Sequence, residues 1–493
     1  MRILMLGWEF PPFISGGLGT ACHGLTRALD RQGHQVLFVL PRAVDRSHSS
    51  HVQLISPEQG ATDAVPLRMP DGSPLPTSGA SPGATASAGG SAPADPSKDP
   101  IFFRLREFRN TQFVGVPSSV VSPYKAGQGG IPFSPEMLKG KATLSEIEAL
   151  RAAGVDIPDD WLRELTGGAG GPIRPMSTDY QGDVLAMAQQ YAQLVVRLCR
   201  GREFDVVHAH DWMTYPAGIA IARLTGKPLV CHIHSTEFDR SGEHVYQRLY
   251  DLERRGMHAA IRVMAVSMYT KTIVVQRYGV EPGKIDVVYN GVDTDQEQPA
   301  SDANVSARDK IVLFLGRITM QKGPEYFIAA AKRVLEKYEH VKFIVAGSGD
   351  MARRMIELAA EMGIGHKVLF TGFLRGKDVT RAFRMADCYV MPSVSEPFGI
   401  APLEALSHDT PVIISKQSGV SEVLTHALKV DFWDVDEMAN KIVAVLKHPP
   451  LSQTLREHGA FELRRLTWDG AASKCVQSYQ MAIDAMTGLV ASA

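Results

Sequence analysis

Two carboxylates and two cations lie in segments that could together form one polar site. Glu396 and Glu404 belong to a stretch expected to enter a helix, and Arg317 and Lys322 are separated by four residues at the end of a predicted strand. Guanidinium and ammonium groups bind phosphate oxygens, whereas carboxylates accept hydrogen bonds from hydroxyl groups. These residue types therefore predict a site for a ligand that carries both phosphate and sugar.

Backbone groups near predicted strand ends add further candidate contacts. The residues of this kind are Gly16, Gly17, Gly347, Ser348, Phe398, Gly399 and Ile400. Glycines allow a ligand to approach the backbone closely, and the unpaired amides at the start of a helix bind anions or hydroxyl groups. The first glycine cluster does not have the spacing of a dinucleotide-binding loop, so we expect it to face a phosphate or a sugar.

Two His-x-His pairs follow predicted strands in the first half of the chain, at 208–210 and 232–234. Imidazoles at neighbouring strand ends could ligate a metal, but no carboxylate cluster suited to a metal accompanies them. We therefore predict polar residues that line a crevice, without a metal. The candidates on this side are His210, Asp211, His234 and Glu237. The Asp-x-Asp triplets at 293–295 and 434–436 are short matches to which we assign no metal.

Strands and helices alternate in a way that could position these residues. The predicted strands are Arg2–Leu6, Gln35–Leu40, Asp205–His208, Leu229–His232, Ala265–Ser267, Ile285–Tyr289, Ile311–Leu315, Val341–Ala346, Val368–Phe370, Cys388–Met391 and Val412–Ile414. Helical patterns separate most of them, which is typical of parallel α/β sheets. We predict two doubly wound, Rossmann-like domains that face one another. Ligands of such sheets bind at the carboxyl ends of the strands, where every motif above is found.

Composition changes sharply between about 57 and 100, where Ala, Gly, Pro, Ser and Thr dominate. Such a segment buries too little apolar surface to offset the cost of ordering, so we predict a disordered insertion. We expect 101–180 to be an irregular insertion, with a strand at Ile101–Leu105 and a helix at Leu144–Ala153. The polar stretch Gln296–Asp309 is the predicted domain linker.

The length, net charge, cysteine content and apolar runs of the chain exclude several classes of protein. The 493 residues are too many for one ordinary core, and the formal net charge of -1 indicates neither nucleic acid nor an anionic membrane as a partner. The five cysteines form no CxxC motif, so we expect a reducing, cytoplasmic location rather than a disulfide framework. No apolar run approaches the ~18 residues of a membrane span, which leaves peripheral membrane contact open.

Taken together, the motifs resemble the retaining GT-B glycosyltransferases of the large family 4 type, most closely its bacterial glycogen and starch synthase-like members. The matching stretches are Gly16–Gly19, His208–Trp212, His232–Glu237, Asn290–Asp293, Gly316–Gly323, Gly347–Gly349, Phe370–Phe373 and Glu396–Glu404. They occur in the family's order across most of the chain. The resemblance implies a GT-B fold, with the active site in the cleft between the two domains.

The resemblance also implies a role for each matched residue. Arg317 and Lys322 would hold the donor diphosphate, Glu396 would contact hydroxyls of the donor sugar, and Glu404 would bind the ribose. His210 would lie against the donor sugar near the reacting carbon, and the backbone at Gly17 would face the diphosphate. Trp468 would mark the point at which the final helix returns to the first domain. The implied domains are 1–295 with 468–493 on the acceptor side, and 310–467 on the donor side.

Two features differ from bacterial glycogen synthases. The segment Ile14–Leu18 lacks the Lys that usually precedes Gly-Gly-Leu, and Glu404 is present where those enzymes usually lack a second glutamate. Both features count against ADP-glucose as the donor and favour the broader family, in which UDP- and GDP-sugars are common.

The predicted activity is transfer of a hexosyl group, glucosyl in the first instance, from a UDP-, ADP- or GDP-hexose to a hydroxyl acceptor such as an α-glucan. No cofactor is expected. One alternative is a family 4 hexosyl- or mannosyltransferase that acts on another glycan, a lipid or a small molecule. Alternatives from other classes are a metallohydrolase built on the His-x-His pairs and a sugar-nucleotide-binding scaffold without turnover. A phosphorylase would need a pyridoxal lysine, for which the chain has no motif.

Overall fold

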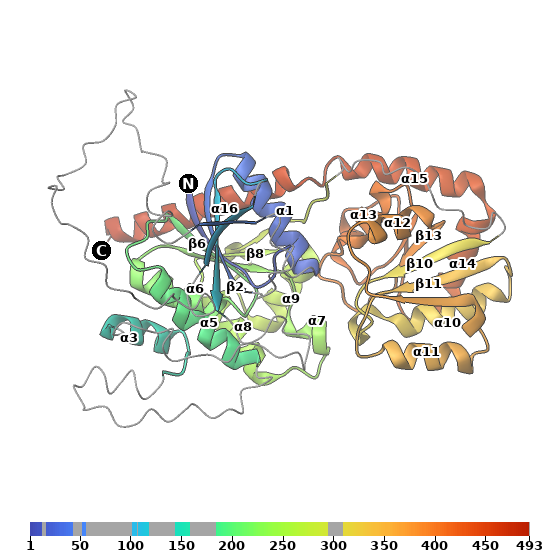
Figure 1. Ribbon diagram of the computed structural model, residues 1–493, viewed down its shortest axis with the longest axis horizontal. Helices are drawn as coiled ribbons and strands as arrows, with labels where there is room; N and C mark the ends of the chain where they lie inside the picture. Colours follow the sequence, from blue (N-terminus) through green and yellow to red (C-terminus); the bar gives the residue numbers. More distant parts are fainter. Residues whose placement is uncertain are drawn as a thin grey trace, which may run out of the picture.

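The computed structural model describes residues 1–11, 16–42, 52–55, 101–105, 107–117, 143–157, 184–293 and 309–492. The insertion predicted at 57–100 lies outside the described residues, as does the predicted linker except for Asp309. Figure 1 shows two α/β domains side by side, one coloured blue to green and the other yellow to orange. The prediction of two parallel, Rossmann-like domains is confirmed.

The first domain is built on a nine-stranded sheet of order β3-β4-β5-β2-β1-β6-β7-β8-β9. Its strands are β1 (Arg2–Leu6), β2 (Gln35–Arg42), β3 (Val52–Ile55), β4 (Ile101–Leu105), β5 (Thr111–Pro117), β6 (Val206–His210), β7 (Leu229–Ile233), β8 (Arg262–Ala265) and β9 (Ile285–Val287). Only the pairs that involve β4 are antiparallel among these strands. Its helices are α1 (Gly17–Arg31), α3 (Leu144–Ala152), α5 (Val184–Leu198), α6 (Tyr215–Thr225), α7 (Glu237–Ser241), α8 (Gln247–Ala259) and α9 (Met268–Tyr278).

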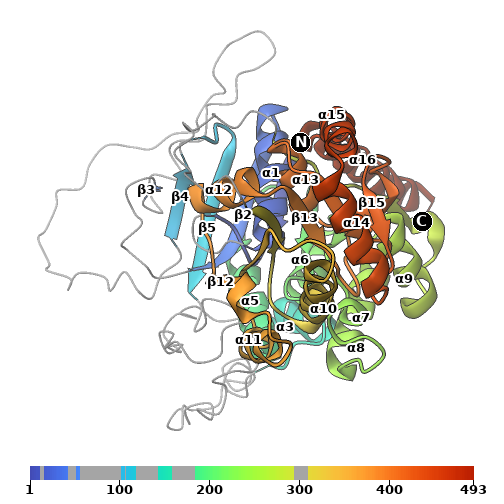
Figure 2. The same cartoon turned by 90° about the vertical axis from the view of Figure 1, so that its right-hand side faces the viewer.

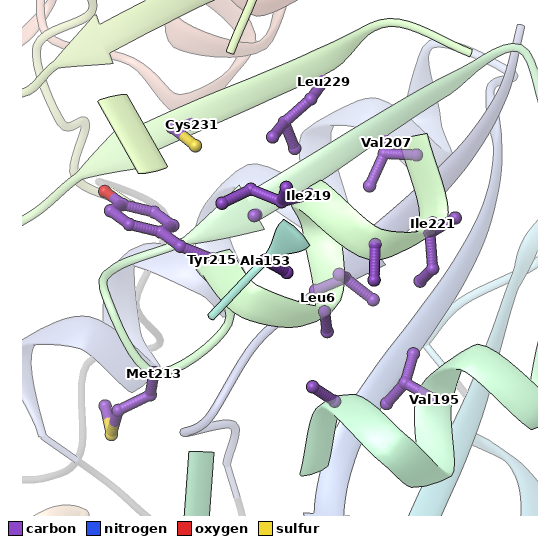
Figure 3. Close-up of a cluster of buried hydrophobic side chains, with 14 of the residues drawn as sticks. Leu6, Ala153, Val195, Val207, Met213, Tyr215, Ile219, Ile221, Leu229 and Cys231 are labelled. Carbon is purple, nitrogen blue, oxygen red and sulfur yellow. The ribbon is translucent and has the colours of Figure 1, made fainter. Parts of the chain in front are cut away.

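Alternating side chains give this sheet two separate cores. On β1, Leu4 and Leu6 belong to the core shared with α3, α5 and α6, whereas Ile3 and Met5 face α1. Figure 3 shows part of the first core, in which Tyr215 and other α6 side chains pack under the sheet. Because helices cover both faces, the central strands are largely apolar, and histidines at the ends of β6 and β7 are the main polar residues within them.

The second domain has a six-stranded, parallel sheet of order β12-β11-β10-β13-β14-β15. Its strands are β10 (Lys310–Leu315), β11 (Val341–Ala346), β12 (Val368–Gly372), β13 (Cys388–Met391), β14 (Val412–Ser415) and β15 (Leu428–Val430). Its helices are α10 (Pro324–Leu335), α11 (Ala352–Glu361), α12 (Lys377–Met385), α13 (Ala401–Ser407), α14 (Val435–Lys447) and α15 (Pro449–Leu463), with the 3-10 helices η5 (Met320–Lys322) and η7 (Gly419–Glu422). Helices α10, α11 and α14 share one core, and α12 and α13 belong to the core on the other face (Figure 2).

Helix α16 (Trp468–Ser492) returns from the second domain and packs on the first sheet beside α1 (Figure 1). Its first residue, Trp468, is 4% exposed and lies directly over Gly24, where a β-carbon would come within 2.2 Å of the indole ring. Two chain crossings therefore connect the domains, one through 293–309 and one at Leu466–Trp468. The crossings touch, because the Val292 amide donates to the Leu466 carbonyl (3.0 Å).

Part of the region expected to be an irregular insertion differs from that expectation. Residues 111–117 pair in parallel with β2 over seven residues, and β4 adds an antiparallel strand to them. The sequence did not indicate this because backbone pairing with a distant strand, rather than a local pattern, selects the strand conformation. Helix α3 confirms the helix predicted there.

We expect Trp468→Ala to lower the free energy of unfolding by about 3–5 kcal/mol, because it leaves a large cavity between α16 and α1. Trp433→Ala is the matched control, since Trp433 is 58% exposed, and its effect should stay within about 0.5 kcal/mol. Urea unfolding followed by far-UV circular dichroism measures both. Equal transition midpoints for the two variants would contradict the role given to Trp468.

Candidate functional site

Two loops at the carboxyl edge of the second sheet are bonded together. The Gly316 amide donates to Ala346 O and the Ile318 amide donates to Ser348 O, both at 3.0 Å. Gly347 has φ of +144°, and a β-carbon there would lie 1.8 Å from the Gly316 carbonyl oxygen, so only glycine fits. The structure thus brings Arg317 beside Ser348, as the strand order β10-β11 requires.

The Lys322 ammonium and the Glu396 carboxylate form an ion pair across neighbouring strand ends. Lys322 Nζ lies 2.5 Å from Glu396 Oε2, to which Ser393 Oγ also donates at 3.2 Å. Glu396 is only 7% exposed, so its charge needs such a partner. The pair brings together two predicted site residues that are far apart in sequence, and it neutralises a carboxylate that would otherwise repel an anionic ligand.

The helix after Glu396 begins later than the sequence suggested. Helix α13 starts at Ala401 with Ile400 as its N-cap residue, so Phe398 and Gly399 lie in the preceding loop. Glu404 consequently lies in the first turn of α13. Proline at 402 and the left-handed backbone at Gly399 (φ +103°) fix this start. Burial raises the pKa of the Glu404 carboxyl to about 7.

The first domain presents its glycine-rich loop and a carboxylate that the sequence analysis missed. Gly16 is the N-cap of α1, and Glu9 Oε2 accepts a hydrogen bond from the Gly19 amide (3.3 Å). Burial raises the pKa of Glu9, whereas the Gly19 amide and the charge of Arg317 lower it. Glu9 and Arg317 are therefore close enough to interact across the two domains. An acidic residue just after a buried strand and before a glycine cluster was the available signal.

Four histidines form a stacked group on one face of the first sheet. Residues 208, 210, 232 and 234 alternate with core residues of β6 and β7, so all four point toward the α16 side. His208 Nε2 lies 3.2 Å from His232 Nδ1, and His210 Nδ1 lies 2.9 Å from His234 Nε2. Tyr479 of α16 contacts His208 Nδ1 at 2.7 Å. Helix α16 thus supports the inner end of the group.

The histidines are neutral at physiological pH. Burial lowers the pKa of His208, His210 and His232 far below the ordinary range, and it lowers that of His234 to about 3. Ligand atoms of His208, His210 and His232 lie within 4.8 Å of one another, which is compatible in residue type with a metal. His208 Nε2 and His232 Nδ1 contact one another, whereas His210 Nε2 and His232 Nε2 are buried without a hydrogen-bond partner, and no carboxylate joins that group among the described residues.

Asp211 and Glu237 have partners within the first domain. Asp211 adopts a left-handed backbone (φ +57°), and its Oδ1 accepts from the His234 amide (2.7 Å), which ties the ends of β6 and β7 together. Burial raises the pKa of Asp211 to about 7. Glu237 accepts from Arg240, Ser241 and the Tyr246 amide. Both oxygens of Glu237 thus support α7, and the structure does not bring its carboxylate to the ion pair of the second domain.

Contacts between the two domains involve residues that the sequence analysis did not single out. Asp239 of α7 accepts from Ser395, and Tyr269 of α9 contacts the same serine hydroxyl. Glu422 accepts from the first two amides of α9. These residues carry no local motif, and only the packing of the two domains identifies them.

Comparison with known proteins gives a consistent family. Models described as "Glycosyl transferases group 1", "Glycosyltransferase Family 4" and "Starch synthase catalytic domain" match residues 295–460, 164–296 and 2–71. An uncharacterized glycosyltransferase of Methanocaldococcus jannaschii is 32% identical over 307 residues, which cover 58% of this chain and 77% of that protein. Glycogen synthase of Mycobacterium tuberculosis is 25% identical over 97% of this chain and 94% of its own length.

Among solved structures, sucrose-phosphate synthase from Thermosynechococcus elongatus matches with a TM-score of 0.65 and 17% identity, covering 98% of this chain and all of that one. This likeness concerns the fold. In the described part of the chain, every helix is too short or too polar to cross a membrane.

Glu404→Gln should stabilise the protein at pH 8 and have little effect at pH 5. The folded-state pKa of about 7 lies above the ordinary 4.5, so the unfolded chain releases this proton first and stability falls as pH rises from about 4.5 to 7. Glutamine cannot ionise and avoids that cost, which we set at about 1–2 kcal/mol because the side chain is partly exposed. Thermal unfolding at both pH values measures it, with the exposed Glu357→Gln as control. An equal gain at both pH values would contradict the assignment.

Proposed function

Because the chain belongs to the group 1 glycosyltransferases, we propose that it transfers a glucosyl group from a nucleotide diphosphate sugar to a hydroxyl acceptor, with retention of anomeric configuration. The observation that carries the proposal is the Lys322–Glu396 ion pair at the edge of the second sheet, where the loop after β10 also carries Arg317. It supplies phosphate-binding cations and a hydroxyl-binding carboxylate at one sheet edge. Glu9, which bonds to the glycine-rich loop of the other domain, also feels the charge of Arg317.

Cleavage of the bond between the sugar C1 and the phosphate oxygen develops negative charge on the diphosphate. Arg317 and Lys322 would stabilise this charge, and backbone amides near Gly16 and in the loop Phe398–Ile400 would add donors. Because Lys322 also contacts Glu396, the same ammonium can link the phosphate side of the donor to its sugar side. Glu404, in the first turn of α13, is the candidate for the ribose hydroxyls.

The opposite charge develops on the sugar, which gains oxocarbenium character. Glu396 would orient the sugar through its hydroxyls, while the neutral His210 would lie against the ring near C1. A neutral imidazole can donate or accept a hydrogen bond without repelling the developing positive charge. Retention would follow if the acceptor attacks on the face that the phosphate leaves, with the phosphate oxygen taking the acceptor proton.

The acceptor that we propose first is an α-glucan. The match to glycogen synthase extends over 97% of this chain, which supports a shared acceptor side as well as a shared donor side. Other acceptors, such as a sugar phosphate, would fit the same chemistry. We propose UDP- and ADP-glucose as the first donors to test, and a reducing, cytoplasmic setting is in keeping with five buried free thiols.

A metal has no assigned step in this mechanism. The family membership does not favour the metallohydrolase alternative, and the cations of the second domain can balance the charge of the diphosphate. The His208–His210–His232 group nevertheless makes chelation a useful arm of the experiment.

The test is release of nucleotide diphosphate from UDP-, ADP- and GDP-hexoses, with and without glycogen or maltooligosaccharides and with and without EDTA. We expect one donor to give release that depends on glucan and survives EDTA. Glu396→Gln should lower kcat by about 10²–10³-fold, because it removes a charged contact at the reacting sugar, whereas the surface control Glu357→Gln should not.

Each other outcome has a defined meaning. Release that depends on a different acceptor would retain the transferase and replace the glucan. Release that EDTA abolishes would restore a metal to the mechanism. Failure of every donor to react with the wild-type protein would refute the proposed function.

A further inference from the structure

The loop that carries Glu396 is held by the opposite domain on both sides of that residue. On one side, Ser395 Oγ donates to Asp239 Oδ1 at 2.5 Å and lies 3.0 Å from the Tyr269 hydroxyl. On the other side, the carbonyl oxygen of Pro397 accepts from Ser267 Oγ at 2.5 Å. Glu396 therefore lies between two cross-domain hydrogen-bonded positions, although its own carboxylate bonds only within the second domain.

Asp239 has a fixed orientation because one of its carboxylate oxygens, Oδ2, already accepts two hydrogen bonds. Asp239 Oδ2 accepts from both the amide and the hydroxyl of Thr236 at 2.7 Å, in the capping box that begins α7. The residue is 2% exposed, and its hydrogen bonds to Ser395 and Thr236 partly offset the rise in pKa that burial causes. With Oδ2 held in this way, Oδ1 is directed at Ser395.

Helix α7, which carries Asp239, is held in the first domain by buried ion pairs and hydrogen bonds. Arg240 pairs with Glu237 and with the buried Glu253, which also accepts from the Glu237 amide and from the Tyr278 hydroxyl. These charges are buried and mutually compensated, so breaking one leaves another unpaired at a large cost. Such a network fixes α7 within the first domain, independently of its contacts with the second.

The second attachment uses the start of α9. Ser267 is the N-cap of α9 and accepts from the Thr270 amide at 2.9 Å while donating to Pro397. Thr270 Oγ1 also lies 3.2 Å from the Pro397 carbonyl oxygen. The Glu422 carboxylate accepts from the Met268 amide (2.9 Å), which places a negative charge at a helix N-terminus. Ser395, Pro397 and Glu422 of the second domain thus bond to residues of α7 and of the N-terminal end of α9 in the first domain.

We propose that Asp239 and Ser267 are positioning residues that couple closure of the two domains to the orientation of the Glu396 carboxylate. This inference rests on the proposed function for its catalytic consequence. The four hydroxyl-mediated bonds join the two domains, so separation of the domains would break them and release the loop that orients Glu396, whereas closure excludes water from the cleft. The expected benefit is transfer to the acceptor in preference to hydrolysis of the donor.

Ser395→Ala tests the coupling at the residue that joins both Asp239 and Tyr269. Misplacing a reacting group by about 1 Å can cost about 10²-fold, so we expect kcat to fall by about 10–100-fold. Binding of the nucleotide diphosphate alone should change by less than about threefold, because Ser395 does not hold the diphosphate in the proposed site. Donor hydrolysis without acceptor should rise relative to transfer.

Three variants distinguish this role from a merely structural one. Ser395→Thr keeps the hydroxyl and should restore most of the wild-type kcat. Ser452→Ala on α15 is the matched control and should leave kcat and the hydrolysis ratio unchanged. In a double-mutant cycle, Asp239→Asn and Ser395→Ala should be non-additive in kcat, since each removes the same bond.

Hydrogen–deuterium exchange gives a readout that needs no turnover. Peptides that span 393–400 should exchange faster in Ser395→Ala than in the wild-type protein, with no change in peptides from β10 or β11. If the wild-type protein turns over no donor, the proposed function fails and this arm still decides whether the first domain holds the loop.

Three results would overturn the inference. One is wild-type kcat, hydrolysis ratio and exchange in Ser395→Ala. Another is equal inactivity of Ser395→Thr and Ser395→Ala, which would exclude the hydroxyl as the coupling group. The third is a loss of both nucleotide binding and thermal stability in Ser395→Ala, which would mean that unfolding of the variant explains its lower kcat.

Discussion

A nearly buried carboxylate needs a compensating cation, and this requirement organises the site. Glu396 lies after β13 and Lys322 lies in η5 after β10, and these two strands are hydrogen-bonded neighbours in the second sheet. Parallel pairing therefore carries the two charges to the same edge. Gln321 reinforces the pairing, because its side chain donates to the Ser395 carbonyl and its own carbonyl accepts from the Val394 amide. The loop is thus bonded at its backbone as well as through its charge.

The two domains contribute different electrostatics to the space between them. The second domain offers exposed or half-buried cations, whereas the first offers neutral imidazoles stacked on the α16 face of its sheet. A ligand with an anionic part and a hydroxylated, uncharged part fits this division. Glu9 is the exception in the first domain, and its proximity to Arg317 links the glycine-rich loop to the cations.

The two chain connections between the domains meet at one place. The chain crosses twice, and the crossings meet where the Val292 amide bonds to Leu466 and where Gly291 lies against the Trp468 backbone. Trp468 then anchors α16 to α1, so rotation is expected near the crossing rather than within the first core. The bonds from Asp239 and Ser267 to the Glu396 loop add further contacts between the domains, and Val266, next to Ser267, shares a buried cluster with Val292 and Leu466.

Local sequence was sufficient for the repeating elements and for most of the charged candidates. Apolar runs that end in polar residues predict parallel strands, and the glycines around Arg317 and Lys322 predict a loop open to a ligand. The Lys322–Glu396 contact agrees with that reading, although the roles of these residues remain predictions. The amides of Phe398 and Gly399 precede α13 rather than opening it, because the left-handed backbone at Gly399 keeps them in the loop.

Tertiary structure alone decided how distant segments meet. The local sequence of β5 does not indicate a strand, and the segment becomes one by pairing with β2. The local sequence likewise does not single out Asp239, which gains its partner Ser395 through the packing of α7 against the second domain. The sequence determined which chemistry the chain can offer, since residue type and strand-end position follow from local patterns. Packing determined which groups lie close enough to act together, because hydrogen bonds and ion pairs depend on distances between residues that are far apart in the chain.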